Sequence, residues 1–153
     1  MKSYKMSIIA AAIAVGAGQS LSAETVAKPG SLYERLGGKP AIEAVVDDFV
    51  SRILADERVN GWFAHAASKP ELELAFKRKL ADFVCQGTGG PCAYAGADMI
   101  TAHKGRGVTE AAFNAVVSDL VATLNKLKVP EKEKTDLLAI LAPLKPAIVQ
   151  EPK

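Results

Sequence analysis

The sequence predicts an all-α fold, and three observations support this class. Apolar residues recur at helical spacing in several long segments, capping residues stand where those segments begin, and no segment alternates like a strand. The chain has 153 residues, 49% hydrophobic and 24% charged, which suits one globular domain with its own core. We divide it into an export signal at residues 1–23, a linker at 24–30 and a helical domain at 31–150.

Residues 1–23 have the pattern of a secretory signal peptide. Lys2 and Lys5 precede an apolar stretch over residues 6–17, and small residues follow up to Ala23. Leu21 stands where a small residue is preferred before cleavage, so an uncleaved membrane-anchoring helix is the alternative, although the stretch is short for a span. We expect cleavage, a periplasmic or secreted protein, and no stable membrane insertion afterwards.

The charge of the mature chain gives no indication of a nucleic-acid partner. Removing Lys2 and Lys5 changes the balance from 19 basic against 17 acidic residues to 17 against 17. The slight basicity of the whole chain therefore belongs to the export signal, and a near-neutral domain does not attract a polyanion. After residue 30 there is no run of about 18 apolar residues that would predict a membrane span.

Two helices are predicted in the first part of the domain. Ser31 with Glu34 three residues later has the pattern of a capping box, and Gly37-Gly38 ends that short helix. Pro40 suits the first turn of a second helix. Its apolar face consists of Ile42, Val45, Val46, Phe49, Val50, Ile53 and Leu54. Asn60-Gly61 breaks this pattern, and we expect an irregular corner at Trp62-Phe63.

Three more helices follow. The apolar face of the helix expected over residues 71–86 consists of Leu72, Phe76, Leu80, Phe83 and Val84. Thr109 can cap a long helix whose apolar residues are Phe113, Val116, Val117, Leu120, Val121, Leu124 and Leu127. Pro130 begins a last helix, which Pro143 and Pro146 should kink or fray because neither has an N–H to donate. These faces fit an up-down bundle or a globin-type packing equally well.

A glycine-rich segment between the third and fourth predicted helices places His103 on a short helical turn. A neutral imidazole presented in this way can be an axial ligand of haem iron, and the alternative is a surface histidine. Cys85 and Cys92 flank the start of this segment. We favour a disulfide between them if the chain is exported, with two free thiols as the alternative. Two cysteines and two distant histidines do not form a recognisable metal-binding pattern.

Five short motifs occur together in an order that is typical of one family. They are Leu32-Tyr33-Glu34-Arg35-Leu36-Gly37-Gly38, Asp48-Phe49, Trp62-Phe63, Gly89-Gly90-Pro91 with Tyr94-Ala95-Gly96, and Met99 with His103, Gly105 and Gly107. With these motifs the chain resembles the group I truncated haemoglobins over roughly residues 31–150. The resemblance implies a two-over-two helical sandwich around haem b (iron protoporphyrin IX), with His103 as the proximal iron ligand.

The resemblance also implies which side chains surround the haem. Phe63 takes the place of the aromatic residue that packs on the haem face, and Tyr94 belongs to the turn before His103. Further pocket-lining positions are matched by Phe49, Phe83, Met99 and Phe113, each of which would also be a core residue in any helical fold. On the distal side Val50 stands where many members have tyrosine, and Phe76 and Leu80 occupy two further distal positions.

The distal side chains favour a particular ligand behaviour. Val50, Phe76 and Leu80 cannot donate a hydrogen bond, so we expect weak retention of O2 and comparatively good binding of NO and CO. The first alternative is a haem enzyme for NO dioxygenation, which needs stable O2 binding and an unknown reductase or electron donor. A peroxidase-like oxidation would need a polar acid/base group over the iron. The last alternative is a haem-free helical interaction domain.

The chain is about five residues longer between Phe63 and Gly89 than the family pattern, and we expect an enlarged loop at residues 64–69. Lys79, beside Leu80, is either a distal iron ligand or a partner of a haem propionate, and we favour the propionate because iron ligation needs a deprotonated amine. His65 is expected to be exposed rather than a distal ligand.

Overall fold

The computed structural model describes residues 27–150, so the expected export signal and residues 24–26 lie outside the described part. Within residues 27–150 all regular secondary structure is helical, as predicted. The elements in chain order are α1 (Leu32–Leu36), α2 (Gly38–Ala55), α3 (Asn60–Ala67), α4 (Pro70–Gly87), α5 (Met99–His103), α6 (Glu110–Lys126), α7 (Glu131–Leu141), the 3-10 helix η1 (Ala142–Leu144) and α8 (Lys145–Ile148).

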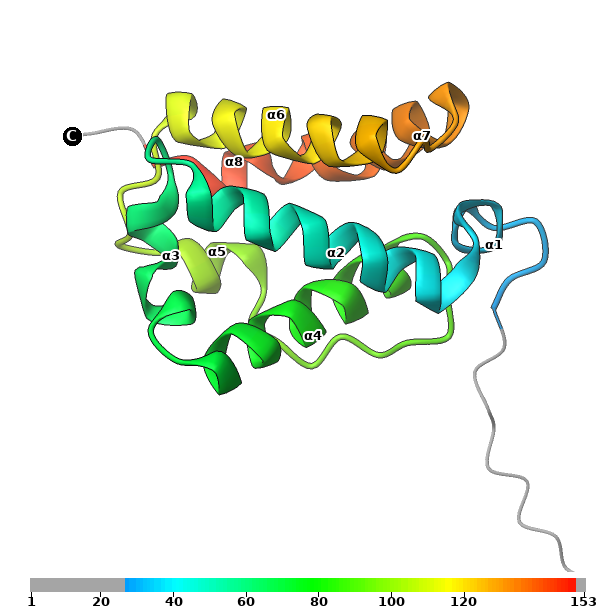
Figure 1. Cartoon of the computed structure of the whole chain (residues 1–153), viewed down its shortest axis with the longest axis horizontal. Helices are drawn as coiled ribbons and strands as arrows, with labels where there is room; N and C mark the ends of the chain where they lie inside the picture. Colours follow the sequence, from blue (N-terminus) through cyan, green and yellow to red (C-terminus); the bar gives the residue numbers. More distant parts are fainter. Residues whose placement is uncertain (1–26, 151–153) are drawn as a thin grey trace, which may run out of the picture.

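Helix α2 lies between two groups of helices. In Figure 1, α6 with α7 and α8 lies above α2, and α4 lies below it. Helix α2 packs against both α4 and α6, while α1 contacts α2 and α7, and the short α5 contacts α8. This arrangement places α4 and α5, which carry most of the expected haem contacts, on the same side of the molecule as α3 (Figure 1).

The first helix begins as the sequence predicts. The Ser31 hydroxyl accepts the N–H of Glu34 at 3.3 Å, and the Glu34 carboxylate accepts the N–H of Gly30 at 2.6 Å, one residue before the position expected for a capping box. Gly37 ends α1 with a φ of 104°, in the left-handed region that glycine adopts without strain. The chain can therefore turn directly into α2.

The apolar face of α2 is confirmed, whereas that of α6 is only partly as predicted. Ile42, Val46, Phe49, Val50 and Ile53 are all buried. In α6 the predicted Leu120 and Leu124 are buried, but Leu127 is 39% exposed, and the rest of the buried face is small or polar: Ala112, Ala115, Asp119 and Thr123. Small side chains on α6 allow it to approach α2 closely, which a pattern of large apolar residues does not reveal.

The prediction of an irregular corner at Trp62-Phe63 and a loop at residues 64–69 is wrong, because most of this segment is helical. Asn60–Ala67 form α3, and the backbone N–H and hydroxyl of Ser68 both donate to the carbonyl of His65 at its end. Val59, immediately before α3, is buried at 1% exposure and fixes the start of the helix in the core. The extra residues are therefore absorbed by a short helix, and Pro70 then begins α4.

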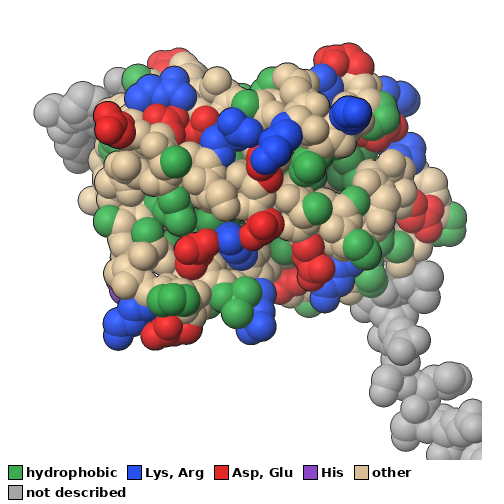
Figure 2. Space-filling model, in the orientation of Figure 1, with side chains coloured by type: hydrophobic (Ala, Val, Ile, Leu, Met, Phe, Trp, Pro, Cys, Tyr) green, Lys and Arg blue, Asp and Glu red, His purple; other side chains and the backbone are tan. Residues whose placement is uncertain are grey.

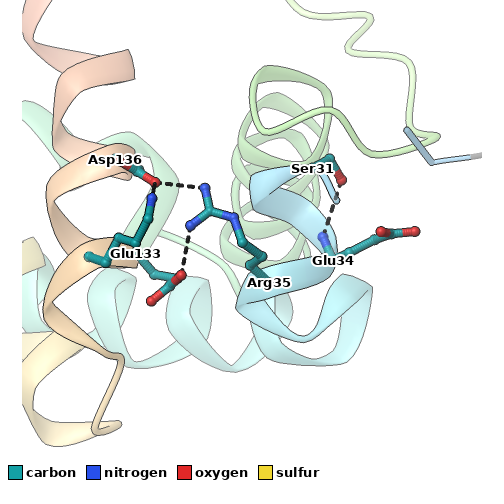
Figure 3. Close-up of polar contacts among 6 residues, drawn as sticks. Ser31, Glu34, Arg35, Glu133 and Asp136 are labelled. Atoms are coloured by element: carbon teal, nitrogen blue, oxygen red, sulfur yellow. Dashed lines mark hydrogen bonds and ion pairs between the residues drawn. The ribbon is translucent and has the colours of Figure 1, made fainter. Parts of the chain in front are cut away.

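The two ends of the domain are joined by ion pairs (Figure 3). The Arg35 guanidinium of α1 donates to Glu133 at 2.7 Å and to Asp136 at 2.6 Å, both in α7. Hydrogen bonds from Lys132 and Arg35 hold the pKa of Asp136 below its ordinary value. Past this contact α7 ends at Leu141, and Pro143 and Pro146 lie in η1 and α8, so the predicted interruption is confirmed.

Basic and acidic side chains are interspersed over the face shown in Figure 2. No helix within residues 27–150 is long and apolar enough to cross a membrane.

Candidate functional site

Helix α5 carries His103 and is fixed at its start by Asp98. One carboxylate oxygen of Asp98 accepts the Thr101 N–H at 3.0 Å, and the other accepts the Thr101 hydroxyl at 2.7 Å. These hydrogen bonds lower the pKa of Asp98, which keeps a negative charge at the N-terminal end of the helix where the backbone dipole favours it. A five-residue helix is thereby held in one conformation.

The imidazole of His103 is oriented by its own helix. Its Nδ1 lies 2.8 Å from the carbonyl oxygen of Met99, one turn earlier. A carbonyl can only accept, so Nδ1 carries a proton, and in the neutral form of the ring Nε2 then presents its lone pair. Among the described residues Nε2 has no hydrogen-bond partner. A neutral imidazole fixed in this tautomer is the form that ligates a metal through Nε2.

Hydrogen bonds hold the loop after His103 at two points. The indole N–H of Trp62, in α3, donates to the carbonyl of Arg106 at 2.9 Å. The side-chain carbonyl of Gln150 accepts the N–H of Gly107 at 2.9 Å, and the N–H of Gln150 donates to Val108 at 2.8 Å. Neither contact was predicted from the sequence. The single tryptophan was the available signal for the first one, because a buried indole N–H usually finds a hydrogen-bond acceptor.

The loop before His103 is joined to the end of α4. Cys85 and Cys92 form a disulfide with their Cα atoms 5.7 Å apart, so the predicted pairing is present. Tyr94 packs edge-on against Phe83 at 5.2 Å, and its N–H donates to the side chain of Gln86 at 2.7 Å. A Cβ at Gly90 would lie 2.6 Å from the Cys85 sulfur, so only glycine allows this close approach.

The expected distal residues come together on α2, α3 and α4. Phe49 and Val50 are buried, and Phe76 and Leu80 pack against the clusters that contain them. The rings of Phe63 and Phe76 lie 5.7 Å apart. Cys85 is the buried residue of α4, and the apolar residues predicted for its inner face, Leu72, Phe76, Leu80, Phe83 and Val84, are half-buried. Neither the buried Val50 of α2 nor the half-buried Phe76 and Leu80 of α4 can donate a hydrogen bond.

The remaining candidates lie at the edge of this region. Phe113 is half-buried beneath the Lys145 ammonium, which is 5.8 Å from the ring centroid. Lys79 is exposed on α4 and forms no ion pair within residues 27–150. His65 is exposed near the end of α3, as expected from the sequence.

Two surface hollows of about 400 and 460 Å³ lie elsewhere, along α2 and α6. The larger one is lined by alternating charges, among them Asp56, Arg58 and Asp119. Burial and the neighbouring Asp56 carboxylate raise the pKa of Asp119, while Arg58 lowers that of Asp56. His103 lines neither hollow.

The residues present fit a haem group. In its neutral form His103 offers a nitrogen ligand whose tautomer the Met99 carbonyl selects, and α4 and α5 carry partly exposed apolar side chains that a porphyrin could cover. Lys79 supplies a solvent-exposed cation suited to a carboxylate. Within residues 27–150 no group of three or more acidic, histidine or cysteine side chains could hold a bare metal ion.

Comparisons with known proteins agree with this interpretation. Residues 31–150 match the family model described as bacterial-like globin. A group 1 truncated hemoglobin from Mycolicibacterium paratuberculosis is 38% identical over 122 residues, covering 80% of this chain and 86% of the relative.

Solved structures show the same similarity. The truncated hemoglobin from Tetrahymena pyriformis in its Fe(III) form has a TM-score of 0.71 at 30% identity, covering 79% of this chain and 99% of that one. The 2/2 hemoglobin from Synechococcus has a TM-score of 0.66 at 33% identity, covering 73% and 90%. The chain is therefore a haem-binding globin of the bacterial-like family, and it belongs to the group 1 truncated haemoglobins.

Proposed function

We propose that this globin binds haem b through Nε2 of His103 and reversibly binds diatomic gases. The observation that carries the proposal is the 2.8 Å contact between His103 Nδ1 and the Met99 carbonyl, which leaves Nε2 as the metal-binding nitrogen. Haem iron, when bound, supplies the coordination position for O2, NO or CO. The chain supplies the axial ligand, the apolar surroundings and the exclusion of water.

Two groups of side chains would hold the porphyrin. Met99, Phe83 and Phe113 would pack on or around the His103 side, with Tyr94 fixing Phe83 and the turn that leads into α5. Phe49, Val50, Phe63, Phe76 and Leu80 would cover the opposite side. We assign Lys79 to a haem propionate rather than to iron, because its side chain is exposed at the surface of α4.

The apolar distal side chains determine the ligand preference that we propose. O2 depends on a distal hydrogen bond for slow dissociation more than CO does, and Val50, Phe76 and Leu80 offer none. We therefore propose rapid loss of O2 and comparatively tight binding of CO and NO. The same absence of a donor on these side chains disfavours an oxygen-storing role.

We also propose that residues 1–23 direct export and are removed, which would place the mature protein in the periplasm or outside the cell. The charged start, apolar middle and small residues at 22–23 support this, and so does a disulfide, which oxidising compartments maintain. Expression of the full chain followed by mass measurement of the periplasmic protein tests the cleavage site.

The axial ligand is tested by comparing the only two histidines of the chain. His103→Ala should abolish the histidine-ligated spectrum of the ferrous protein and its CO complex, and added imidazole should restore it. His65→Ala is the matched control and should leave the oxidised, reduced and CO spectra unchanged. An unaltered spectrum of His103→Ala would refute ligation by this residue.

A further inference from the structure

Trp62 of α3 is hydrogen-bonded to the backbone that follows His103. It is the only tryptophan of the chain, and its indole N–H donates to the Arg106 carbonyl at 2.9 Å across 44 residues of sequence. The Arg106 N–H in turn donates to the carbonyl of His103 at 3.1 Å. One peptide segment therefore links the indole directly to the backbone of the histidine.

The loop between His103 and Val108 has little rigidity of its own. Gly105 and Gly107 adopt positive φ values of 75° and 63°, and a Cβ at either would meet no atom within 4 Å. Such open glycine positions permit many backbone conformations. Gln150 forms hydrogen bonds at the Val108 end of this loop. Nearer to the histidine, the side-chain hydrogen bond that holds the loop is the one from Trp62 to Arg106.

The residue that follows Trp62 in α3 contacts the apolar side chains on the opposite side of the proposed site. This residue, Phe63, packs against Phe76 of α4 at 5.7 Å. Trp62 and Phe63 both belong to one eight-residue helix, α3, so a shift of this helix moves Phe63 and the indole together. Helix α3 thus contacts Phe76 of α4 through Phe63, and it contacts the loop after His103 through Trp62.

We propose that Trp62 is a positioning residue for His103 and couples the distal side of the pocket to the proximal ligand. The Trp62–Arg106 hydrogen bond holds the backbone of His103 at a fixed distance from α3. A bound gas that shifts α3 through Phe63 would then change the orientation of the His103 imidazole. The inference rests on the proposed ligation of iron by His103.

The first test uses the wild-type holoprotein. Because the chain has a single tryptophan, its indole N–H gives one resonance in a 15N–1H spectrum. We expect this resonance to be protected from hydrogen exchange and to move when CO binds to the ferrous protein. A rapidly exchanging indole N–H, or a resonance that CO leaves unmoved, would overturn the proposal.

The second test uses Trp62→Phe, which keeps an aromatic ring but removes the donor. We expect a displaced or broadened iron–histidine stretching band in the resonance Raman spectrum of the ferrous protein. We also expect haem loss to be roughly threefold to tenfold faster, the factor that one net hydrogen bond supplies. Arg106→Ala is the matched control, because it removes the side chain but keeps the acceptor carbonyl, and it should leave the band unchanged.

The outcomes separate this inference from the proposed function. If the wild-type protein lacks an iron–histidine band that depends on His103, the proposed function fails. If that band is present but identical in Trp62→Phe, the ligand assignment stands and the positioning role is refuted. If Trp62→Phe does not fold, the wild-type indole measurement still decides the question.

Discussion

At the scale of single residues, the proposed ligand preference depends most on Val50. The side chain is fully buried in α2, and Phe76 and Leu80 pack against its cluster. A buried hydrocarbon at this position excludes water but offers no hydrogen to a ligand. The chemistry of one side chain therefore separates the proposed ligand preference from that of an oxygen-retaining globin.

Val50→Tyr should slow the dissociation of O2 from the ferrous protein by roughly tenfold to a hundredfold, because one strong hydrogen bond would be added. Stopped-flow displacement of O2 by CO measures this rate. Val50→Phe is the matched control, since it adds the same ring without the hydroxyl. Equal O2 dissociation rates in the two variants would show that the residue at position 50 does not face the bound gas.

At the scale of elements, α4 and the loop before α5 act as one unit. The Cys85–Cys92 disulfide, the Phe83–Tyr94 ring contact and the Gln86–Tyr94 hydrogen bond all join them over a short stretch of chain. Helix α4 and the approach to His103 are thereby connected by both covalent and polar contacts. A shift at the end of α4 must therefore also shift the start of α5.

Replacing both Cys85 and Cys92 by alanine should lower the free energy of unfolding by roughly 2–3 kcal/mol, the chain-entropy value for closing so short a loop. Denaturant titration of the oxidised protein measures the loss. In a reducing buffer most of the difference between wild type and variant should disappear. A double variant as stable as the oxidised wild type would show that the disulfide does not constrain the unfolded chain.

At the scale of the whole molecule, the first and last parts of the domain are held together by Arg35. This residue of α1 reaches Glu133 and Asp136 of α7, about a hundred positions later in the sequence. Glu133 is only 12% exposed in its side chain, so it depends on the guanidinium for its pairing. The contact holds α1 against the layer that also contains α8, the neighbour of α5.

Arg35→Met should lower the melting temperature at neutral pH, and the difference from wild type should shrink in acid. The pKa of Asp136 is lowered in the folded protein, so its contribution is present above its ordinary value of 3.8 and is lost as the pH falls through the folded value. Thermal unfolding between pH 7 and pH 3 measures the trend.

Lys39→Met is the control, because it removes a lysine from an exposed pair within one helix and should change little at any pH. A loss in Arg35→Met that is independent of pH would show that packing of the arginine chain, rather than its ion pairs, stabilises the fold.

Elements that depend on local chemistry could be predicted from the amino-acid sequence alone. Capping residues such as Ser31 and Thr109, the apolar period of α2 and the prolines after Leu141 were enough to place helices, because each acts within a few residues. The motif order was sufficient to name His103 as the candidate ligand. Local patterns did not suffice at residues 60–67, where burial of Val59 outweighs an Asn-Gly break and a helix forms.

Contacts between distant segments could be identified only in the folded molecule. The Met99 carbonyl fixes the tautomer of His103, Trp62 reaches the loop after it, and Arg35 pairs with α7. The buried face of α6 also depended on how closely α2 approaches it, which favours Ala112 and Ala115 over larger residues. Spacing along the chain encodes local helices, but partners 44 or 98 residues apart are chosen by packing in three dimensions.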